Sequence, residues 1–185
     1  MVTTLSRFRG ALLGLAVGDA LGTTLEFKPG SFTPIDDVVG GGPFRLKAGQ
    51  WTDDTSMALC LAESLVETVD FDLSDQLRRY VRWYRHGHLS STGRCFDIGN
   101  ATRAALERFE RDGDEYAGSE DPQTAGNGSI MRLAPVPLVY SSYSVQRAGK
   151  QAGVSSMTTD RVASPVSASL LDSLATAPTR CLPSR

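Results

Sequence analysis

The chain has 185 residues, 41% of them hydrophobic and 22% charged, with a formal net charge of −2. This length suits one domain with a substantial core, and a near-neutral charge without a basic stripe argues against a nucleic-acid partner. The three cysteines, Cys60, Cys95 and Cys181, lack zinc-site spacing, so we expect a reducing, cytoplasmic setting. No apolar segment has the length of a signal peptide or a membrane span, so no membrane partner is expected.

Residues 4–20 are predicted to form the first helix, because apolar side chains recur there at helical spacing. Within and just after it, glycines recur at every fourth position: Gly10, Gly14, Gly18 and Gly22. Each glycine costs a helix about 1 kcal/mol, which favours a face that another backbone approaches closely. Residues 28–50 are rich in glycine and proline and are predicted to be a loop, long enough to suggest a cover over a functional site.

The most informative stretch is residues 49–57, GQWTDDTSM, which leads into a second predicted helix. Thr52 or Asp53 is expected at its N-cap. Carboxylates in a first turn stay ionised and oriented, and together with threonine hydroxyls they suit a hard cation such as Mg²⁺ or Mn²⁺. Taken alone, however, these residues are explained more simply as a well-capped helix, because one helix end cannot complete an octahedral oxygen shell.

Two further helices are predicted downstream. Asp72 or Ser74 is expected to cap one that runs to about Tyr84, and residues 86–88, HGH, are expected to form a surface turn. The other is predicted over residues 96–109, with acidic and amide side chains in its first turn. Ordinary capping also accounts for those side chains.

The segment 126–129, GNGS, offers backbone freedom and exposed amides of the kind that bind an anion or a sugar. An ordinary turn explains the motif equally well when it is taken alone. Pro135 and Pro137 are expected to kink or shorten a helix over residues 130–139, and a last helix is predicted over residues 145–157. Because no segment shows sustained period-two alternation, we expect an all-α fold.

Taken together, these motifs resemble those of the ADP-ribosylglycohydrolase family, in particular its bacterial branch that contains the dinitrogenase-reductase-activating glycohydrolase. The matching segments, in family order, are residues 9–22, 26–27, 40–44, 49–57, 95–100 and 126–132. The resemblance covers roughly residues 7–159. It favours a functional role for the acidic residues over simple capping.

The resemblance implies an all-α hydrolase with a two-metal centre of Mg²⁺ or Mn²⁺. Such enzymes cleave the bond that joins ADP-ribose to a protein side chain, commonly arginine. By this likeness Thr52, Asp53 and Asp54 are metal ligands, and Glu26, Asp54 and Asp97 are the catalytic carboxylates. Carboxylates with cations can activate water for glycoside cleavage. Which of the three acts as the base is left open.

The resemblance also implies a partner, either an ADP-ribosylated protein or a small molecule that contains ADP-ribose. The residues expected to bind this substrate are Asn100, Gly126, Asn127, Gly128, Ser129 and Arg132.

The last part of the chain departs from the family pattern. The late Asp-x-Asp-Thr/Ser segment that supplies the second ligand set is not found, and Asp160 follows Thr158-Thr159 where the family tends to place a histidine. We therefore expect a domain over residues 1–159 and a divergent, poorly ordered tail over residues 160–185, produced by truncation or a shift of reading frame. A genuine short tail is the alternative. Hydrolase activity of this chain is then doubtful, and an inactive ADP-ribose-binding module or a non-functional fragment are the competing hypotheses.

Overall fold

A computed structural model describes residues 3–28, 33–68, 71–124, 126–142, 151 and 155. Its α-helices are α1 (Thr4–Gly22), α2 (Asp53–Glu67), α3 (Leu73–His86), α4 (Asn100–Asp112) and α5 (Pro135–Val139). Single 3-10 turns occur at Thr23–Leu25, Pro122–Thr124 and Tyr140–Ser142. Within these residues there is no β-strand, only an isolated bridge between Gly41 and Leu46, so the all-α prediction is confirmed.

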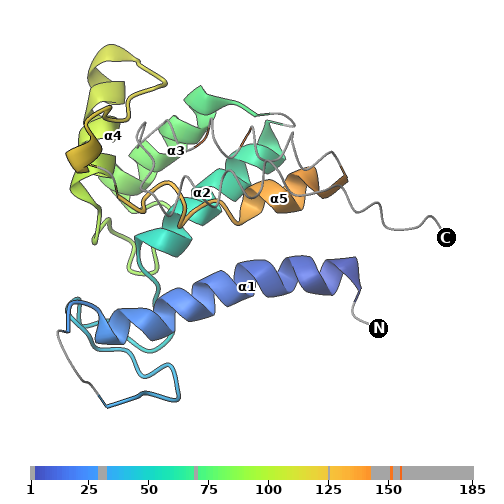
Figure 1. Cartoon of the computed structure of the whole chain (residues 1–185), viewed down its shortest axis with the longest axis vertical. Helices are drawn as coiled ribbons and strands as arrows, with labels where there is room; N and C mark the ends of the chain where they lie inside the picture. Colours follow the sequence, from blue (N-terminus) through green and yellow to red (C-terminus); the bar gives the residue numbers. More distant parts are fainter. Residues whose placement is uncertain are drawn as a thin grey trace.

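Helix α2 lies at the centre and contacts α1, α3 and α5 (Figure 1). Its apolar stripe is formed by Met57, Leu61 and Leu65, all buried, as the helical spacing predicts. The stripe packs against a larger buried set from α3, α4 and α5: Leu77, Tyr80, Trp83, Leu106 and Val136. This core fixes α2 along its length, and therefore fixes the position of its first turn.

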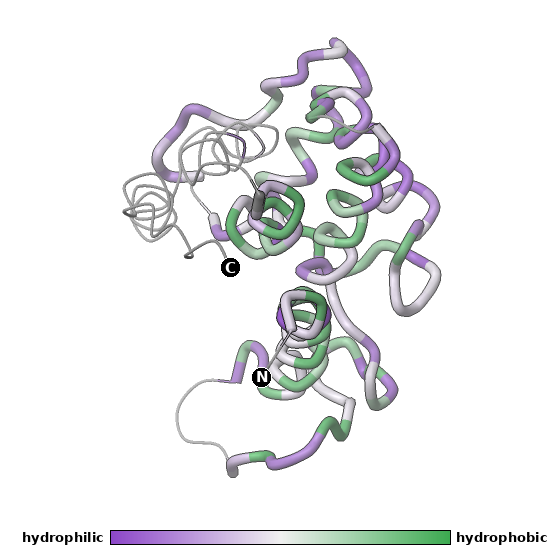
Figure 2. Tube along the Cα trace, turned by 90° about the vertical axis from the view of Figure 1, so that its right-hand side faces the viewer, coloured by the Kyte–Doolittle hydropathy of each residue, from purple (hydrophilic) through white to green (hydrophobic). Residues whose placement is uncertain are grey.

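Helix α1 differs from the others, because Ala20 is its only buried residue. In Figure 2 it forms a separate layer beside the rest of the helices. A Cβ built on any of its four regularly spaced glycines meets nothing within 4 Å. The expected close approach of a second backbone is therefore not seen among the described residues, since no described element lies against that face.

The predicted starts of α2 and α3 are confirmed. Thr52 is the N-cap of α2. Asp72 is the N-cap of α3, where its side chain accepts a hydrogen bond of 2.8 Å from the backbone N–H of Asp75. Helix α3 ends at Gly87, whose φ of 68° is the left-handed conformation typical of a helix C-cap. Among the described residues, no helix is long and apolar enough to cross a membrane.

Two other predicted helices are shorter than expected. Helix α4 begins at Asn100 rather than at residue 96, because Asp97 has a φ of 57° and cannot belong to a right-handed helix. Helix α5 begins only at Pro135, which places both Pro135 and Pro137 in its first turn, where a backbone N–H has no partner within the helix. The predicted helix over 145–157 and the tail over 160–185 lie outside the described residues, apart from Gln151 and Ser155.

The loop between α1 and α2 packs against the end of α1. The hydroxyl of Thr24 donates to the carbonyl of Gly40 at 3.1 Å. Gly42 has a φ of 66°, and a Cβ there would lie 2.4 Å from the carbonyl oxygen of Thr23. Glycine is therefore required at this close approach. The loop thus lies beside the acidic residues that follow α1, consistent with its expected place near a functional site.

An ion-pair network joins α2 to α3. The buried guanidinium of Arg79 lies 2.6 Å from a carboxylate oxygen of Glu63, 2.9 Å from Glu67 and 2.6 Å from Asp75. His88 is also within 2.7 Å of Glu63. The surface-turn prediction is therefore incomplete, because His88 is partly buried against α2.

We expect Arg79→Ala to lower the free energy of unfolding by about 3 kcal/mol, because it leaves three carboxylates without their shared cation. Urea denaturation measures this change. Arg111→Ala is the matched control, since its pair with Asp112 is exposed and its loss is expected to have no measurable effect. Equal effects of the two substitutions would contradict the assigned role of the network.

Candidate active site

The carboxylate of Asp19, on α1, holds the first turn of α2. One oxygen accepts from the backbone N–H and the hydroxyl of Thr52, at 3.0 and 2.7 Å. The other accepts from the backbone N–H and the hydroxyl of Thr55, at 3.1 and 2.7 Å. Asp19 therefore caps α2 from another helix, while the side chain of Thr52 makes no capping bond of its own. Asp19 is not among the residues predicted for the site, although it lies in the segment 9–22 that matches the family.

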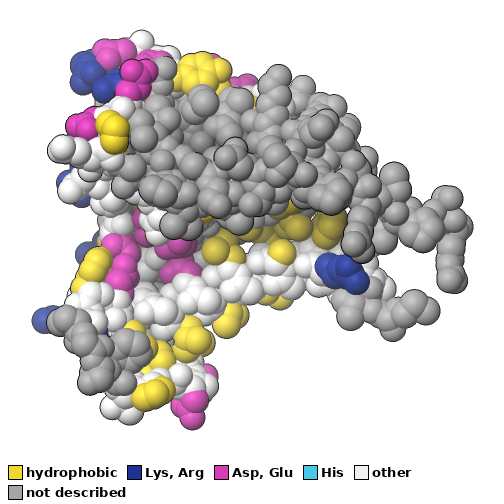
Figure 3. Space-filling view, viewed as in Figure 1, with side chains coloured by type: hydrophobic (Ala, Val, Ile, Leu, Met, Phe, Trp, Pro, Cys, Tyr) yellow, Lys and Arg dark blue, Asp and Glu magenta, His cyan; other side chains and the backbone are white. Residues whose placement is uncertain are grey.

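This arrangement gathers the predicted carboxylates around one helix end. Asp53 and Asp54 are in the first turn of α2. Glu26 follows the 3-10 turn after α1 and lines, with Asp19 and Asp54, a cavity of about 550 Å³. Figure 3 shows acidic side chains in the hollow beside α1. We call Asp19, Glu26, Asp53, Asp54 and Asp97 the acidic cluster.

Burial, together with the crowding of like charges, raises the pKa values of Asp53, Asp54 and Asp97. Burial raises the pKa of Asp53 to about 8, and the charges of Asp97 and Asp54 add to the shift. Burial, followed by the charges of Asp19 and Glu26, raises the pKa of Asp54 to about 6. The pKa of Asp97 rises to about 7 through burial and the charge of Glu26. The cluster therefore favours whatever positive charge can neutralise it, whether a proton or a cation.

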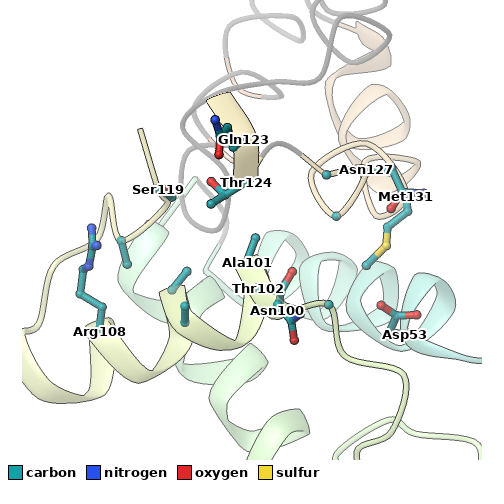
Figure 4. Close-up of a pocket in the computed structure, with 16 residues that line it drawn as sticks. Asp53, Asn100, Ala101, Thr102, Arg108, Ser119, Gln123, Thr124, Asn127 and Met131 are labelled. Carbon is teal, nitrogen blue, oxygen red and sulfur yellow. The ribbon is translucent and has the colours of Figure 1, made fainter. Parts of the chain in front are cut away.

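A second cavity, of about 650 Å³, lies between α4 and the chain around residues 117–131 (Figure 4). Four of the predicted substrate-binding residues line it: Asn100, Gly126, Asn127 and Gly128. Gly128 has a structural requirement, because a Cβ there would lie 2.9 Å from the hydroxyl oxygen of Thr102 on α4. Asp53 also lines this cleft, so the cleft opens onto the acidic cluster.

The other two predicted substrate residues lie behind the cleft wall. Ser129 and Arg132 are buried and do not line the cavity. The guanidinium of Arg132 donates to the carbonyls of Gly128 and Ser155 and lies 5.2 Å from the centre of the Tyr80 ring. These contacts give Arg132 a role in holding the loop in place. A direct role for Ser129 or Arg132 in binding substrate stays a prediction.

Among the described residues, the site offers the types of ligand that a divalent cation prefers, but too few of them to hold one ion. Carboxylates and threonine hydroxyls are the oxygen ligands that Mg²⁺ and Mn²⁺ prefer, and the charge repulsion in the acidic cluster favours a cation. Within the described part of the chain, however, no three acidic, histidine or cysteine side chains are placed to hold one ion. The hydroxyl of Thr52 is also committed as a donor to Asp19. The first turn of α2 therefore supplies an incomplete ligand set.

The fold and the site define a class of all-helical domains in which a cleft adjoins a cluster of carboxylates. The chain belongs to the ADP-ribosylglycohydrolase family, whose model matches residues 1–177. A solved structure titled "ADP-ribosylglycohydrolase-related protein complex" shares 44% identity, with a TM-score of 0.74 over 95% of this chain and 58% of that one.

Curated relatives agree with this assignment. The ADP-ribosylarginine hydrolase Tri1 of Pseudomonas putida (strain GB-1) is 62% identical over 134 residues, covering 72% of this chain and 36% of the relative. Tri1 of Serratia proteamaculans (strain 568) is 52% identical over 156 residues, covering 84% and 42%. The ADP-ribosyl-[dinitrogen reductase] glycohydrolase of Rhodospirillum rubrum is 38% identical over 137 residues, covering 71% and 44%. The chain thus spans less than half the length of these relatives.

We expect Asp19→Ala to lower the free energy of unfolding by about 2 kcal/mol, at the upper end for a helix cap, because the carboxylate accepts from two residues of α2. Thermal denaturation measures the loss. Asp72→Ala, which removes a cap that accepts from Asp75 alone, is the control and is expected to cost about 1 kcal/mol. A smaller effect at Asp19 than at Asp72 would contradict its role as the anchor of the site.

We expect Asp53→Asn to stabilise the cation-free protein in a pH-dependent manner. Because the pKa of Asp53 is raised from 3.8 to about 8, its ionisation disfavours the folded state progressively as the pH rises between these values. The gain from Asn should be near zero at about pH 4 and grow to several kcal/mol at about pH 8. Urea denaturation across this range tests it, with the exposed Asp112→Asn as control. A gain that does not grow with pH would refute this electrostatic account.

Proposed function

We propose that this chain carries an ADP-ribosylglycohydrolase site that removes ADP-ribose from modified protein side chains, commonly arginine. The observation that carries the proposal is the convergence of the acidic cluster with the cleft at Asp53, which belongs to the cluster and lines the cleft. The relatives named ADP-ribosylarginine hydrolase support arginine as the modified residue.

The cleft suits the ADP-ribose part of the substrate. Its volume of about 650 Å³ lies within the range usual for small-molecule sites. Asn127 and its flanking glycines offer amide groups to the diphosphate, while the apolar floor on α4 (Ala101, Ala104 and Ala105) suits a flat ring. Because Asp53 lies at the opposite end of the cleft from Arg108 (Figure 4), the ribose attached to arginine belongs at the Asp53 end, beside the acidic cluster.

The reaction needs an activated water and a stabilised ribose. Thr52, Asp53 and Asp54 would hold Mg²⁺ or Mn²⁺, which would supply charge for orienting the ribose hydroxyls and water. We assign the base to Asp97, since it belongs to the acidic cluster and lies outside the predicted ligand set. In the proposed step, the water oxygen bonds to the ribose C1 as the C1–N bond breaks. Asp97 takes the proton of the water and passes it on to the departing guanidine nitrogen.

A second candidate is an ADP-ribose-binding module without turnover. It is favoured by the incomplete ligand set among the described residues. The cleft, by contrast, is lined mainly by backbone and small side chains, which need no metal to bind a ligand.

The experiment that separates these functions measures ADP-ribose release from an ADP-ribosylarginine peptide with and without Mn²⁺. For the enzyme, we expect release to require Mn²⁺ and to fall at least about 100-fold in Asp97→Asn, while calorimetry shows retained ADP-ribose binding. Glu115→Gln, outside both cavities, is the control. Release that survives both EDTA and Asp97→Asn would overturn the mechanism. ADP-ribose binding that survives EDTA, with no release under any condition, would establish the binding module instead.

A further inference from the structure

The position of Phe27 is unfavourable in two respects: its side chain is exposed to solvent, and its backbone conformation is strained. Its side chain is 74% exposed, although most large hydrophobic residues of the fold lie in the core. Its φ of 56° lies in the left-handed region, which is a genuine outlier for a bulky residue. Strained residues of this kind are concentrated at ligand-binding and active sites. Neither the core nor the proposed hydrolysis accounts for Phe27.

The ring of Phe27 is the exposed end of a row of three aromatic side chains. Its centre lies 6.3 Å from that of Phe44, with the planes at 75°. Phe44 in turn lies 5.4 Å from Phe96, with the planes at 60°. These are the edge-to-face contacts that aromatic rings favour. We call Phe27, Phe44 and Phe96 the aromatic row.

The row is connected to the acidic cluster along the chain. Phe27 directly follows Glu26, and Phe96 directly precedes Asp97. Glu26 and Asp97 interact electrostatically. The ring contacts of the row join the two chain segments that carry these carboxylates. Figure 3 shows hydrophobic side chains next to acidic ones at this end of α1.

This combination of groups suits a planar cation. An aromatic face attracts a guanidinium through its quadrupole, and arginine stacks on such faces more readily than lysine does. The negative charge of the acidic cluster also attracts such a cation. Lys28 and Arg45, each next to a ring in sequence, oppose it with two positive charges, against the five carboxylates of the acidic cluster.

We propose that the aromatic row, through the exposed face of Phe27, binds the guanidinium of the ADP-ribosylated arginine and so selects arginine-linked substrates. The inference rests on the proposed function, because it places the arginine on the acidic side of the ribose. Phe27 is a specificity-determining residue in this arrangement and transfers no proton.

The test uses two analogues that cannot be hydrolysed. One is a C-glycoside of ADP-ribosylarginine, in which a methylene group is inserted between the ribose C1 and the guanidinium nitrogen. The other is the same molecule with a neutral urea in place of the guanidinium. Their dissociation constants are measured by calorimetry in the presence of Mn²⁺, together with that of ADP-ribose, for the unsubstituted chain and each variant.

We expect the unsubstituted chain to prefer the guanidinium analogue, and Phe27→Leu to reduce that preference about threefold, since leucine keeps apolar bulk but has no π-face. Phe27→Trp should keep the preference. ADP-ribose should bind equally to all variants. Val66→Ala is the matched control, because Val66 is 72% exposed and lies in the last turn of α2, about 18 Å along the helix from its first turn.

The outcomes separate this inference from the function on which it rests. If ADP-ribose binds and Phe27→Leu keeps the full guanidinium preference, the aromatic row is not the arginine site and the inference alone fails. If Phe27→Leu weakens both analogues equally, the row is an apolar contact surface, and the inference fails in favour of that role. If the unsubstituted chain binds neither ADP-ribose nor either analogue, the proposed function fails and the inference fails with it.

Discussion

The site depends on the carboxylate of Asp19, which accepts hydrogen bonds from Thr52 and Thr55 across 33 to 36 residues of chain. Helix α1 buries little else among the described residues, so this contact is a major part of what holds it against α2. The same contact fixes the first turn of α2, where Asp53 and Asp54 lie. One carboxylate thus joins the two walls of the acidic cavity. Its own negative charge also raises the pKa of Asp54.

The site is stable only because the rest of α2 compensates for it. A first turn with two partly or fully buried carboxylates is electrostatically unfavourable, as the raised pKa values of Asp53 and Asp54 show. Further along the same helix, Met57, Leu61 and Leu65 are buried in the core. The burial of these side chains offsets the repulsion at the helix start. Functional sites commonly carry such a cost in stability, and here both contributions belong to one helix.

Local rules predicted the parts of the fold that local interactions determine. The spacing of apolar residues located α2, and the capping residue Asp72 located the start of α3. The loop conformation of Asp97 was missed because helix propensity and apolar spacing do not reveal a positive φ at a single residue. Nor did the sequence show that Arg132 turns inward toward Tyr80. The motif order identified the candidate carboxylates, but the partnership of Asp19 with α2 required the fold.

The first turn of α2 contributes Asp53 to one cavity and Asp54 to the other, which suggests how the proposed site divides its substrate. The cleft on the α4 side offers amides, glycines and an apolar floor, which suit a ligand that is the same in every substrate. The cavity on the α1 side offers Glu26 and Asp54, with the exposed Phe27 beside it. In the proposed arrangement that side faces the bond to be cleaved, so it is where substrates with different modified side chains differ. In the proposed arrangement, affinity for ADP-ribose and selection of the modified residue therefore depend on separate surfaces, and substitutions at one can alter selection without loss of the other.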